Sequence, residues 1–276
     1  MRENRWLDSS RIPIRELHLS GTVDKALELL SYFSAQRSQI GLSEISKLAG
    51  YNKATTRRLL VALQGHGMLE QLNDTKKYRL GPAFLRLARV REAAFPVQVV
   101  VQPIVEQLAA ETGETAHFSL ALGSKLGTIS LKESPRANRV SLEPGETLPL
   151  HATASGIAYL AFAPSQILED VLSKPLVSHT DHTLTDPARI RELVDRARKD
   201  GHSRSDQGYE TEVVGIAAPV FEASGYAQGA IAVATPFSRM TEAAETKIFT
   251  AVRRAAVEIT CAVGAVPHPV LLKDVA

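Results

Sequence analysis

Several features that would assign a chain to a membrane or a secreted class are missing from this sequence of 276 residues. Its single cysteine, Cys261, cannot form an internal disulfide, and no run of about 18 apolar residues indicates a membrane span. The N-terminal stretch is polar and lacks the apolar core of a signal peptide. These absences predict a cytoplasmic protein. Cys261 lies in an apolar helical pattern, which predicts a buried structural thiol.

Signatures of cofactors are missing as well. The sequence has no glycine-rich phosphate loop and no dinucleotide-binding fingerprint. The donors His179, Asp181 and His182 have the spacing of neither a zinc finger nor a metalloprotease helix, so a surface loop is the favoured interpretation. We therefore expect no cofactor and no metal site.

The small net charge of +2 hides an uneven distribution of charge. Residues 1–95 carry a net charge of +7, and the rest of the chain carries −5. The length predicts roughly two domains. A basic first part joined to an acidic second part is typical of a nucleic-acid-binding module attached to another domain.

The basic part contains a predicted helix-turn-helix at residues 42–63. Ser43 is expected to cap the first helix, Gly50 to end it, and Asn52 to cap the second. Helical spacing places one set of residues on the buried side of the second helix: Thr56, Leu59, Leu60 and Leu63.

The opposite side of that second helix is basic near its start and otherwise small. It carries Ala54, Arg58, Val61 and Ala62, flanked by Lys53, Thr55 and Arg57. Short side chains allow close approach to a DNA major groove, where arginine and threonine reach base edges and phosphates. An ordinary helical hairpin with a solvated basic face would have the same pattern, so both interpretations stay open.

The surrounding sequence favours DNA binding. A helix over residues 22–34, with Thr22 as a possible cap, would complete a three-helix core. Strand patterns at 68–72 and 77–80, joined by turn-forming residues, predict a wing on which Lys76 and Lys77 can meet phosphates. The alternative is a pair of solvated lysines on an edge strand. Pro82 then opens a helix that is expected to link the two domains.

The second part predicts a sheet covered by helices, an α+β fold. Helices are expected at 97–112, where Pro103 should kink or split the helix, at 165–174 and 187–200, and after Thr241. Strands are expected at 115–122, 127–132, 213–220 and 226–234, with another within 138–148; residues 202–206 are polar. Between them, residues 148–164 predict a loop that feeds a helix. Its small residues, 152–156, could expose N–H groups to an anion, although close packing on the sheet is the favoured interpretation.

Four motifs occur in the same order as in a known family: the helix-turn-helix, the wing ending in YRLG, HATASGIA at 151–158, and the segment ending in IAAPV. Together they resemble the IclR family of bacterial transcriptional regulators, over roughly residues 20–262. The resemblance implies an N-terminal winged helix-turn-helix, a linker helix and a C-terminal GAF-like effector-binding domain whose antiparallel sheet is flanked by helices. It also implies a regulator that binds operator DNA as a homodimer or homotetramer, responds to a small metabolite, often a carboxylate or an aromatic acid, and is not an enzyme. The expected segments are an arm (1–19), the DNA-binding domain (20–81), the linker (82–95), the effector domain (96–266) and a tail (267–276).

The resemblance also implies site residues. The expected DNA-binding residues are Ser43, Lys53, Ala54, Thr55, Thr56, Arg57, Arg58, Lys76 and Lys77. The expected effector-binding residues are Leu148, Ala154, Ser155, Gly156, Ser205, Asp206, Gly215, Ala217, Ala232 and Ala234.

This chain departs from the family pattern at the effector site. Ile157 follows the glycine where a lysine is usual, and Ser205-Asp206-Gln207-Gly208 replaces a frequent acidic run. Glu212 and Gly215 replace a glycine and a cysteine, and Ala232 and Ala234 replace serines found in some members. These changes predict a roomier, more apolar pocket. We expect an effector with a hydrophobic or aromatic body and a carboxylate that is held by N–H groups near Ala154–Gly156.

Two other functions would fit parts of the same sequence. Ser155, His151 and Asp206 could form the nucleophilic triad of a hydrolase, but no G-x-S-x-G elbow surrounds Ser155. Alternatively, the second domain could serve only for assembly, since a packed core and a cavity look alike in sequence.

Overall fold

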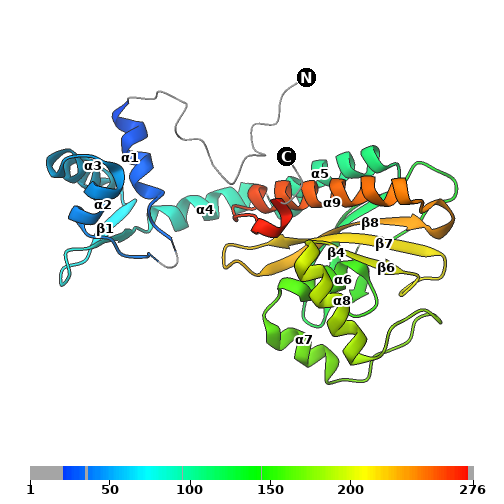
Figure 1. The fold of residues 1–276 in the computed structure, drawn as a ribbon. Helices are drawn as coiled ribbons and strands as arrows, with labels where there is room; N and C mark the ends of the chain where they lie inside the picture. The colour runs from blue at the N-terminus through cyan, green and yellow to red at the C-terminus, as the bar shows by residue number, and fades with distance from the viewer. Residues whose placement is uncertain (1–20, 35–36, 95, 144, 273–276) are drawn as a thin grey trace. The chain divides into compact units, whose positions relative to one another are not determined.

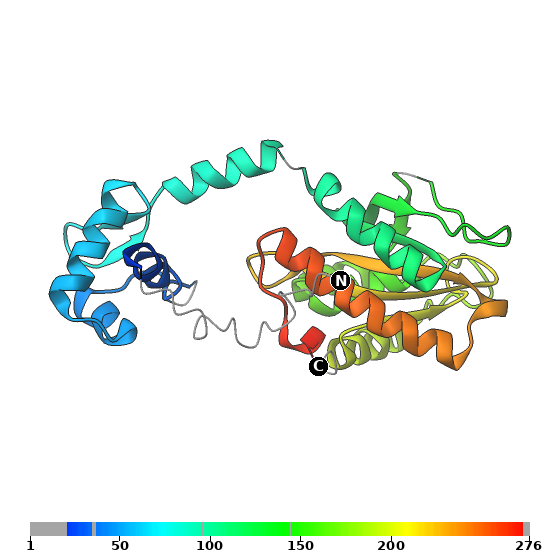
Figure 2. The ribbon, with the colours of Figure 1, turned by 90° about the horizontal axis from the view of Figure 1, so that it is seen from above.

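The computed structural model describes residues 21–34, 37–94, 96–143 and 145–272 (Figures 1 and 2). The described residues divide into two compact units, one that ends at Pro96 and one that begins at Val97. The predicted arm, residues 1–19, lies outside them. Within the described part of the chain, no helix has both the length and the apolar character needed to cross a membrane.

The first unit contains the predicted three helices and hairpin. Its elements are α1 (Thr22–Leu30), α2 (Leu42–Ala49), α3 (Lys53–Gly65), β1 (Leu69–Gln71), β2 (Tyr78–Leu80) and α4 (Ala83–Ala94). Apolar side chains from the first five elements form one core, among them Leu29, Ile45, Leu60 and Leu69. Burial of these side chains is what holds short helices and a two-stranded hairpin together, because neither is stable alone in water.

Two residues define the turn between α2 and α3. Gly50 ends α2 with a left-handed φ of 69°, which glycine adopts without a steric penalty. Asn52 caps α3, since its side chain accepts a hydrogen bond of 2.8 Å from the N–H group of Thr55. Both predictions are confirmed. The predicted caps Thr22 and Ser43 are wrong, because each lies inside its helix and accepts no capping bond.

The second unit is built on a six-stranded antiparallel sheet in the order β5-β4-β3-β8-β7-β6. The strands are β3 (Thr115–Leu122), β4 (Lys125–Lys132), β5 (Thr147–Pro149), β6 (Ser203–Asp206), β7 (Val213–Phe221) and β8 (Ala227–Pro236). The helices are α5 (Val97–Thr112), α6 (Ala154–Phe162), α7 (Ser165–Leu172), α8 (Pro187–Asp200) and α9 (Glu242–Ala262), with the 3-10 turns η1 (Phe237–Arg239) and η2 (Pro269–Leu272). The predicted α+β class, with an antiparallel sheet flanked by helices, is confirmed.

Helices cover both faces of this sheet (Figure 1). Helices α5 and α9 pack on one face, where β7 and β8 contribute large side chains such as Ile216, Val220 and Ile231. Helices α6 and α8 pack on the other face, where the same strands contribute alanines. The alternation follows from the two-residue period of a strand. The alanine face leaves the space in which the candidate site lies.

Three details of the second unit differ from the prediction, and two others refine it. The polar residues 203–206, for which no element was expected, form an edge strand that pairs with β7. Of the two outcomes expected at Pro103, the split does not occur, since α5 continues through this residue. The strand expected within 138–148 is short and lies at its end, as β5. Cys261 is exposed on α9, so the buried thiol is wrong. The segment expected to be a tail from residue 267 onward packs on the domain, and Leu271 is fully buried.

Candidate functional site

The first candidate surface is the outer side of α3. Lys53, Ala54, Arg57 and Arg58 are exposed there, and Thr55 is half-buried. The three cations of this surface are Lys53, Arg57 and Arg58, and none of them forms an ion pair with another described residue. Unpaired cations beside small side chains can approach a phosphate backbone without first breaking an internal ion pair.

Glu28 fastens the helices behind this surface. Its carboxylate accepts hydrogen bonds from the hydroxyl groups of Tyr32, at 2.7 Å, and of Tyr51. Burial, with the bond to Glu28, raises the pKa of Tyr32 to about 12, and the bond to Glu28, with burial, raises that of Tyr51 to about 12. Both tyrosines therefore stay protonated as donors. The bond from Tyr51 joins the turn that precedes α3 to α1, and the bond from Tyr32 fixes the Glu28 side chain at the end of α1.

The wing continues the basic surface. Strands β1 and β2 pair in antiparallel register, with Leu69 opposite Leu80. Lys76 and Lys77 are exposed at the tip, where Lys76 has a left-handed φ of 56° and the Leu72 N–H group donates to the Lys77 carbonyl group at 2.8 Å. The lysine side chains are thus held on a defined turn.

Thr56 is a wrong prediction for DNA contact. Its side chain is fully buried, and its hydroxyl group donates to the Asn52 carbonyl oxygen at 3.1 Å. The same spacing that placed it on the buried stripe of α3 removes it from solvent. Ser43 is exposed at the start of α2 and stays a candidate, although it is not a cap.

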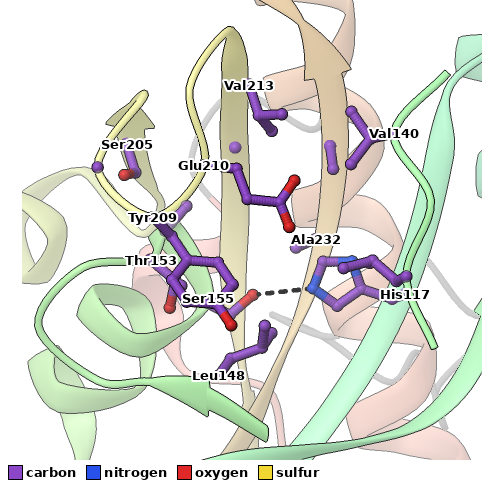
Figure 3. Close-up of a pocket in the computed structure, with 15 residues that line it drawn as sticks. His117, Val140, Leu148, Thr153, Ser155, Ser205, Tyr209, Glu210, Val213 and Ala232 are labelled. Carbon is purple, nitrogen blue, oxygen red and sulfur yellow. Dashed lines mark hydrogen bonds between the residues drawn. The ribbon is translucent and has the colours of Figure 1, made fainter. Parts of the chain in front are cut away.

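The second candidate site is a cavity on the alanine face of the sheet (Figure 3). Seven predicted effector residues line it: Leu148, Ala154, Ser155, Ser205, Gly215, Ala232 and Ala234. Eight further residues complete the lining and were not predicted: His117, Val140, Leu142, Thr153, Gly208, Tyr209, Glu210 and Val213. The lining is mostly apolar, as predicted, although an imidazole and a carboxyl group belong to it. The cavity volume is only about 60 Å³, so the prediction of a roomier pocket is wrong for this structure.

His117 on β3 is a buried polar group of the lining, and its side chain is 5% exposed. Its Nε2 atom lies 3.3 Å from the Ser155 hydroxyl group, and its Nδ1 atom has no partner in the described part of the chain (Figure 3). Burial lowers the pKa of His117 to about 4, so the ring is neutral near pH 7. A buried polar atom without a partner is unfavourable. The cavity therefore holds an unsatisfied group that a bound molecule could satisfy.

Glu210 enters the cavity on the loop between β6 and β7. This loop begins and ends with left-handed residues that are not glycine, Gln207 with φ 56° and Glu212 with φ 63°. Thr180 and Thr183 hold it by donating to the carbonyl groups of residues 207 and 208, at 2.6 and 2.7 Å. Burial, with a smaller contribution from Glu146, raises the pKa of Glu210.

Three predicted effector residues do not line the cavity. Asp206 points away from it, because alternate side chains of β6 face opposite sides, and it pairs with Arg204 at 2.6 Å. Ala217 is fully buried in the core against α6. The Gly156 N–H group is not available to a ligand, because it donates at 3.0 Å to the hydroxyl oxygen of Thr153, which caps α6.

Gly156 has a packing role that predicts the effect of an added methyl group. A Cβ atom there would lie 2.2 Å from the Leu150 carbonyl oxygen. Gly156→Ala should therefore lower the free energy of unfolding by about 1–3 kcal/mol through overpacking, as measured by urea denaturation. Gly65→Ala is the control, because no atom lies within 4 Å of the added group. Unchanged stability in Gly156→Ala, together with lost ligand binding, would instead indicate a contact with the ligand.

The hydrolase triad is not assembled. His151 Nε2 lies 2.9 Å from the Val177 carbonyl oxygen, while Asp206 pairs with Arg204. The imidazole beside Ser155 is that of His117, whose other nitrogen has no carboxylate to orient it. The three predicted residues thus serve separate local contacts.

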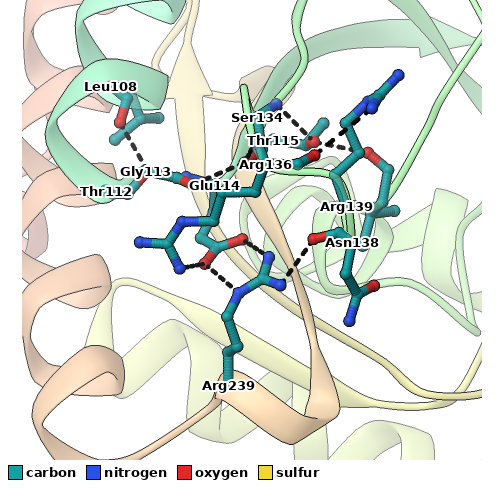
Figure 4. A network of polar contacts seen from close by, with 11 residues as sticks. Leu108, Thr112, Gly113, Glu114, Thr115, Ser134, Arg136, Asn138, Arg139 and Arg239 are labelled. Atoms are coloured by element: carbon teal, nitrogen blue, oxygen red, sulfur yellow. Dashed lines mark hydrogen bonds and ion pairs between the residues drawn. The ribbon is translucent and has the colours of Figure 1, made fainter.

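One wall of the cavity comes from the segment after β4, which carries Val140 and Leu142. Glu114, at the start of β3, fastens this segment through a network of polar contacts (Figure 4). Its carboxylate accepts two bonds from Arg239, at 2.9 and 2.5 Å, and Arg239 also donates to the Asn138 carbonyl oxygen at 2.7 Å. Arg136 adds a longer ion pair of 3.4 Å to the same carboxylate.

Two comparisons with protein families match most of the chain. Residues 22–73 match the IclR helix-turn-helix domain, and residues 93–261 match the bacterial transcriptional regulator IclR C-terminal domain. The HTH-type transcriptional regulator BhcR of Paracoccus denitrificans is 31% identical over 86% of this chain and 85% of its own length. The transcriptional repressor IclR of Escherichia coli is 27% identical over 88% of this chain and 90% of its own.

Solved structures match over similar spans. A crystal structure assigned to the IclR transcriptional regulators, from Silicibacter sp. TM1040, is 42% identical with a TM-score of 0.83, and the match covers 91% of this chain and 98% of that one. An IclR homolog from Microbacterium hydrocarbonoxydans, in complex with 4-hydroxybenzoate, is 26% identical with a TM-score of 0.56 over 88% of this chain and 99% of that one.

Proposed function

Because the chain belongs to the IclR family of bacterial transcriptional regulators, a family of DNA-binding proteins with a C-terminal effector-binding domain, we propose a function for each of its two surfaces. The outer side of α3 and the wing bind an operator, and the cavity of the second unit binds the small molecule that controls this binding. On this proposal the protein acts in the cytoplasm, where its DNA is, and catalyses no reaction.

We propose that α3 enters the major groove. Thr55, Arg57 and Arg58 would contact base edges or nearby groups, and Lys53, Lys76 and Lys77 would contact phosphates. The observation that carries this proposal is the absence of ion-pair partners for the α3 cations among the described residues. Such cations are available to displace counterions from a duplex.

Two substitutions should separate base contacts from phosphate contacts. Arg58→Ala is expected to weaken operator binding by about 1–3 kcal/mol and to relax the preference for the operator over unrelated DNA. Lys77→Ala should weaken binding to all sequences alike and lower the dependence of affinity on salt. Gel-shift titrations over a range of salt concentrations measure both effects. Equal losses on operator and unrelated DNA in Arg58→Ala would contradict its role at bases.

The cavity suits an effector with an aromatic or other apolar body and a carboxylate. Small side chains such as Ala232 and Ala234 line the cavity, whose volume of about 60 Å³ has to widen when an aromatic ring binds. Ala154 and Ser155 are the first residues of α6, so their N–H groups have no helical carbonyl partner and can meet an anion. The relative from Microbacterium hydrocarbonoxydans, solved with 4-hydroxybenzoate, supports this class of ligand.

Calorimetry against a panel of aromatic acids and small hydroxy acids tests this class. We expect aromatic acids such as 4-hydroxybenzoate to bind, and to raise the melting temperature in proportion to occupancy. A preference for the smallest polar acids would overturn the aromatic body. No binding by any acid would overturn the ligand class and favour a second domain that serves only for assembly.

We also propose a homo-oligomer. Helix α4 exposes Leu85 and Val90, at 67% and 62%, and α1 exposes Val23 at 70%. Apolar side chains gathered on helices are typical of contact with a second subunit. A dimer would place two copies of α3 on the two halves of a roughly palindromic operator. Light scattering on the whole chain tests the oligomer, and a monomer at micromolar concentration would contradict it.

A further inference from the structure

Glu210 creates an electrostatic conflict for an acidic ligand. Its carboxyl group points into the cavity toward His117 and Ala232 (Figure 3). No lysine or arginine belongs to the lining of this cavity. A carboxylate ligand would therefore meet a second, half-buried carboxylate in a mostly apolar site, with only N–H and hydroxyl groups to compensate. When two carboxylates share such a site, one of them takes up a proton.

We propose that the cavity binds an acidic effector together with one proton, which Glu210 holds and donates as a hydrogen bond to the ligand carboxylate. This inference rests on the proposed function, because it assumes that an acid binds in this cavity. It adds the charge state in which the acid is accepted. It also makes Glu210 a residue that decides which ligands enter, since a protonated carboxyl group is a donor and an ionised one is not.

The surroundings of Glu210 favour it as the holder of the proton. The titratable groups around it are His117 on β3, Tyr209 on its own loop and Glu146 from the segment before β5. Burial already favours the neutral form of Glu210, and the negative charge of Glu146 favours it further. His117 is a poorer candidate, because it is 5% exposed and its pKa is about 4. The neutral ring can instead accept or donate one hydrogen bond at the free Nδ1 atom.

The proposal fixes the direction of a pH dependence. Above the pKa of Glu210 in the free protein, the complex carries one more proton than the separate protein and ligand anion. The dissociation constant should then rise about tenfold for each pH unit, because the protonated form that binds becomes tenfold rarer. Below that pKa, and above the pKa of the ligand itself, the affinity should be constant. The same proton count holds whichever of the two carboxyl groups carries the hydrogen.

Calorimetry with 4-hydroxybenzoate as the probe tests the inference on the whole chain. Titrations from about pH 5.5 to about pH 8, in buffers with different ionisation enthalpies, give both Kd and the number of protons taken up. The wild-type protein should take up close to one proton at the upper end. Glu210→Gln, which keeps the shape and a donor but cannot ionise, should bind with a constant Kd and bind more tightly than wild type at about pH 8. Melting temperatures confirm that both proteins are folded.

Glu212→Gln is the matched control, since this exposed residue lies two positions away on the same loop and does not line the cavity. It should keep the pH dependence of the wild type. Binding without proton uptake, or a dependence that persists in Glu210→Gln, would overturn the inference while leaving the ligand class intact. Absence of binding by every acid at every pH would overturn the ligand class and this inference with it.

Discussion

Replacing Glu114 by alanine is expected to lower the free energy of unfolding of the second unit by about 3 kcal/mol, near the lower end for breaking a buried ion pair. The Glu114 side chain is 6% exposed and that of Arg239 is 22% exposed. Removal of the carboxylate leaves the mostly buried Arg239 guanidinium group with one acceptor, the Asn138 carbonyl oxygen. Since the partner is not fully buried, some water can reach it, which limits the loss.

Urea denaturation followed by circular dichroism measures this change, and hydrogen exchange on peptides assigns it to β3 and the segment after β4. Glu133→Ala is the control. It breaks the 2.8 Å pair of Glu133 with Arg139, whose side chains are 35% and 39% exposed, so little change is expected. Equal losses in the two variants would contradict the importance we assign to burial. The Glu114 variant should also bind effector less tightly, because Val140 and Leu142 lose their support.

A leucine in place of Ala232 is expected to weaken effector binding by more than about 100-fold, or about 3 kcal/mol. Ala232 lies opposite His117 in the register of β3 and β8, and its side chain faces the cavity. Three added carbon atoms would occupy the space of the ligand body. Operator binding without effector should stay at the level of the wild type, because the substitution lies in the other unit from α3.

Ala232→Ser is the matched control, because it adds a hydroxyl group of small volume at the same position and should keep most of the affinity. Calorimetry measures effector binding, gel-shift titration measures operator binding, and the melting temperature reports any overpacking. Retained effector affinity in a folded Ala232→Leu protein would show that the ligand binds elsewhere. Loss of operator binding in the absence of effector would contradict the independence of the two surfaces.

Local sequence signals predicted most of the fold. Asn52 and Thr241 cap helices because their side chains reach an N–H group three residues on, which spacing alone reveals. Two apolar runs on either side of a turn at Ser224-Gly225 predicted β7 and β8 with nearly the observed bounds. Cys261 was misjudged because it lies beside the buried stripe of α9, one position after the fully buried Thr260.

The candidate cavity was predictable only in part. Its small residues could be inferred from the resemblance to the family, but His117 lies in a strand that looks like ordinary core. Its place in the cavity is evident only from its contact with Ser155, which is 38 residues away in the chain. Glu210 is carried into the cavity by the left-handed residues Gln207 and Glu212, whose backbone conformation no local sequence signal indicates. Groups brought together by tertiary packing are therefore the ones that single-sequence reasoning missed.

The alanines on one face of β7 and β8 have an evolutionary consequence. Every backbone hydrogen bond of these strands is independent of side-chain identity, so the ladder persists when an alanine changes. An alanine codon is one base away from codons for glycine, serine, threonine and valine. Single mutations at Ala232 or Ala234 can thus reshape the chamber in small steps while the scaffold is inherited intact. Proteins that descend from this one can therefore acquire specificity for new metabolites through single substitutions on this face of the sheet.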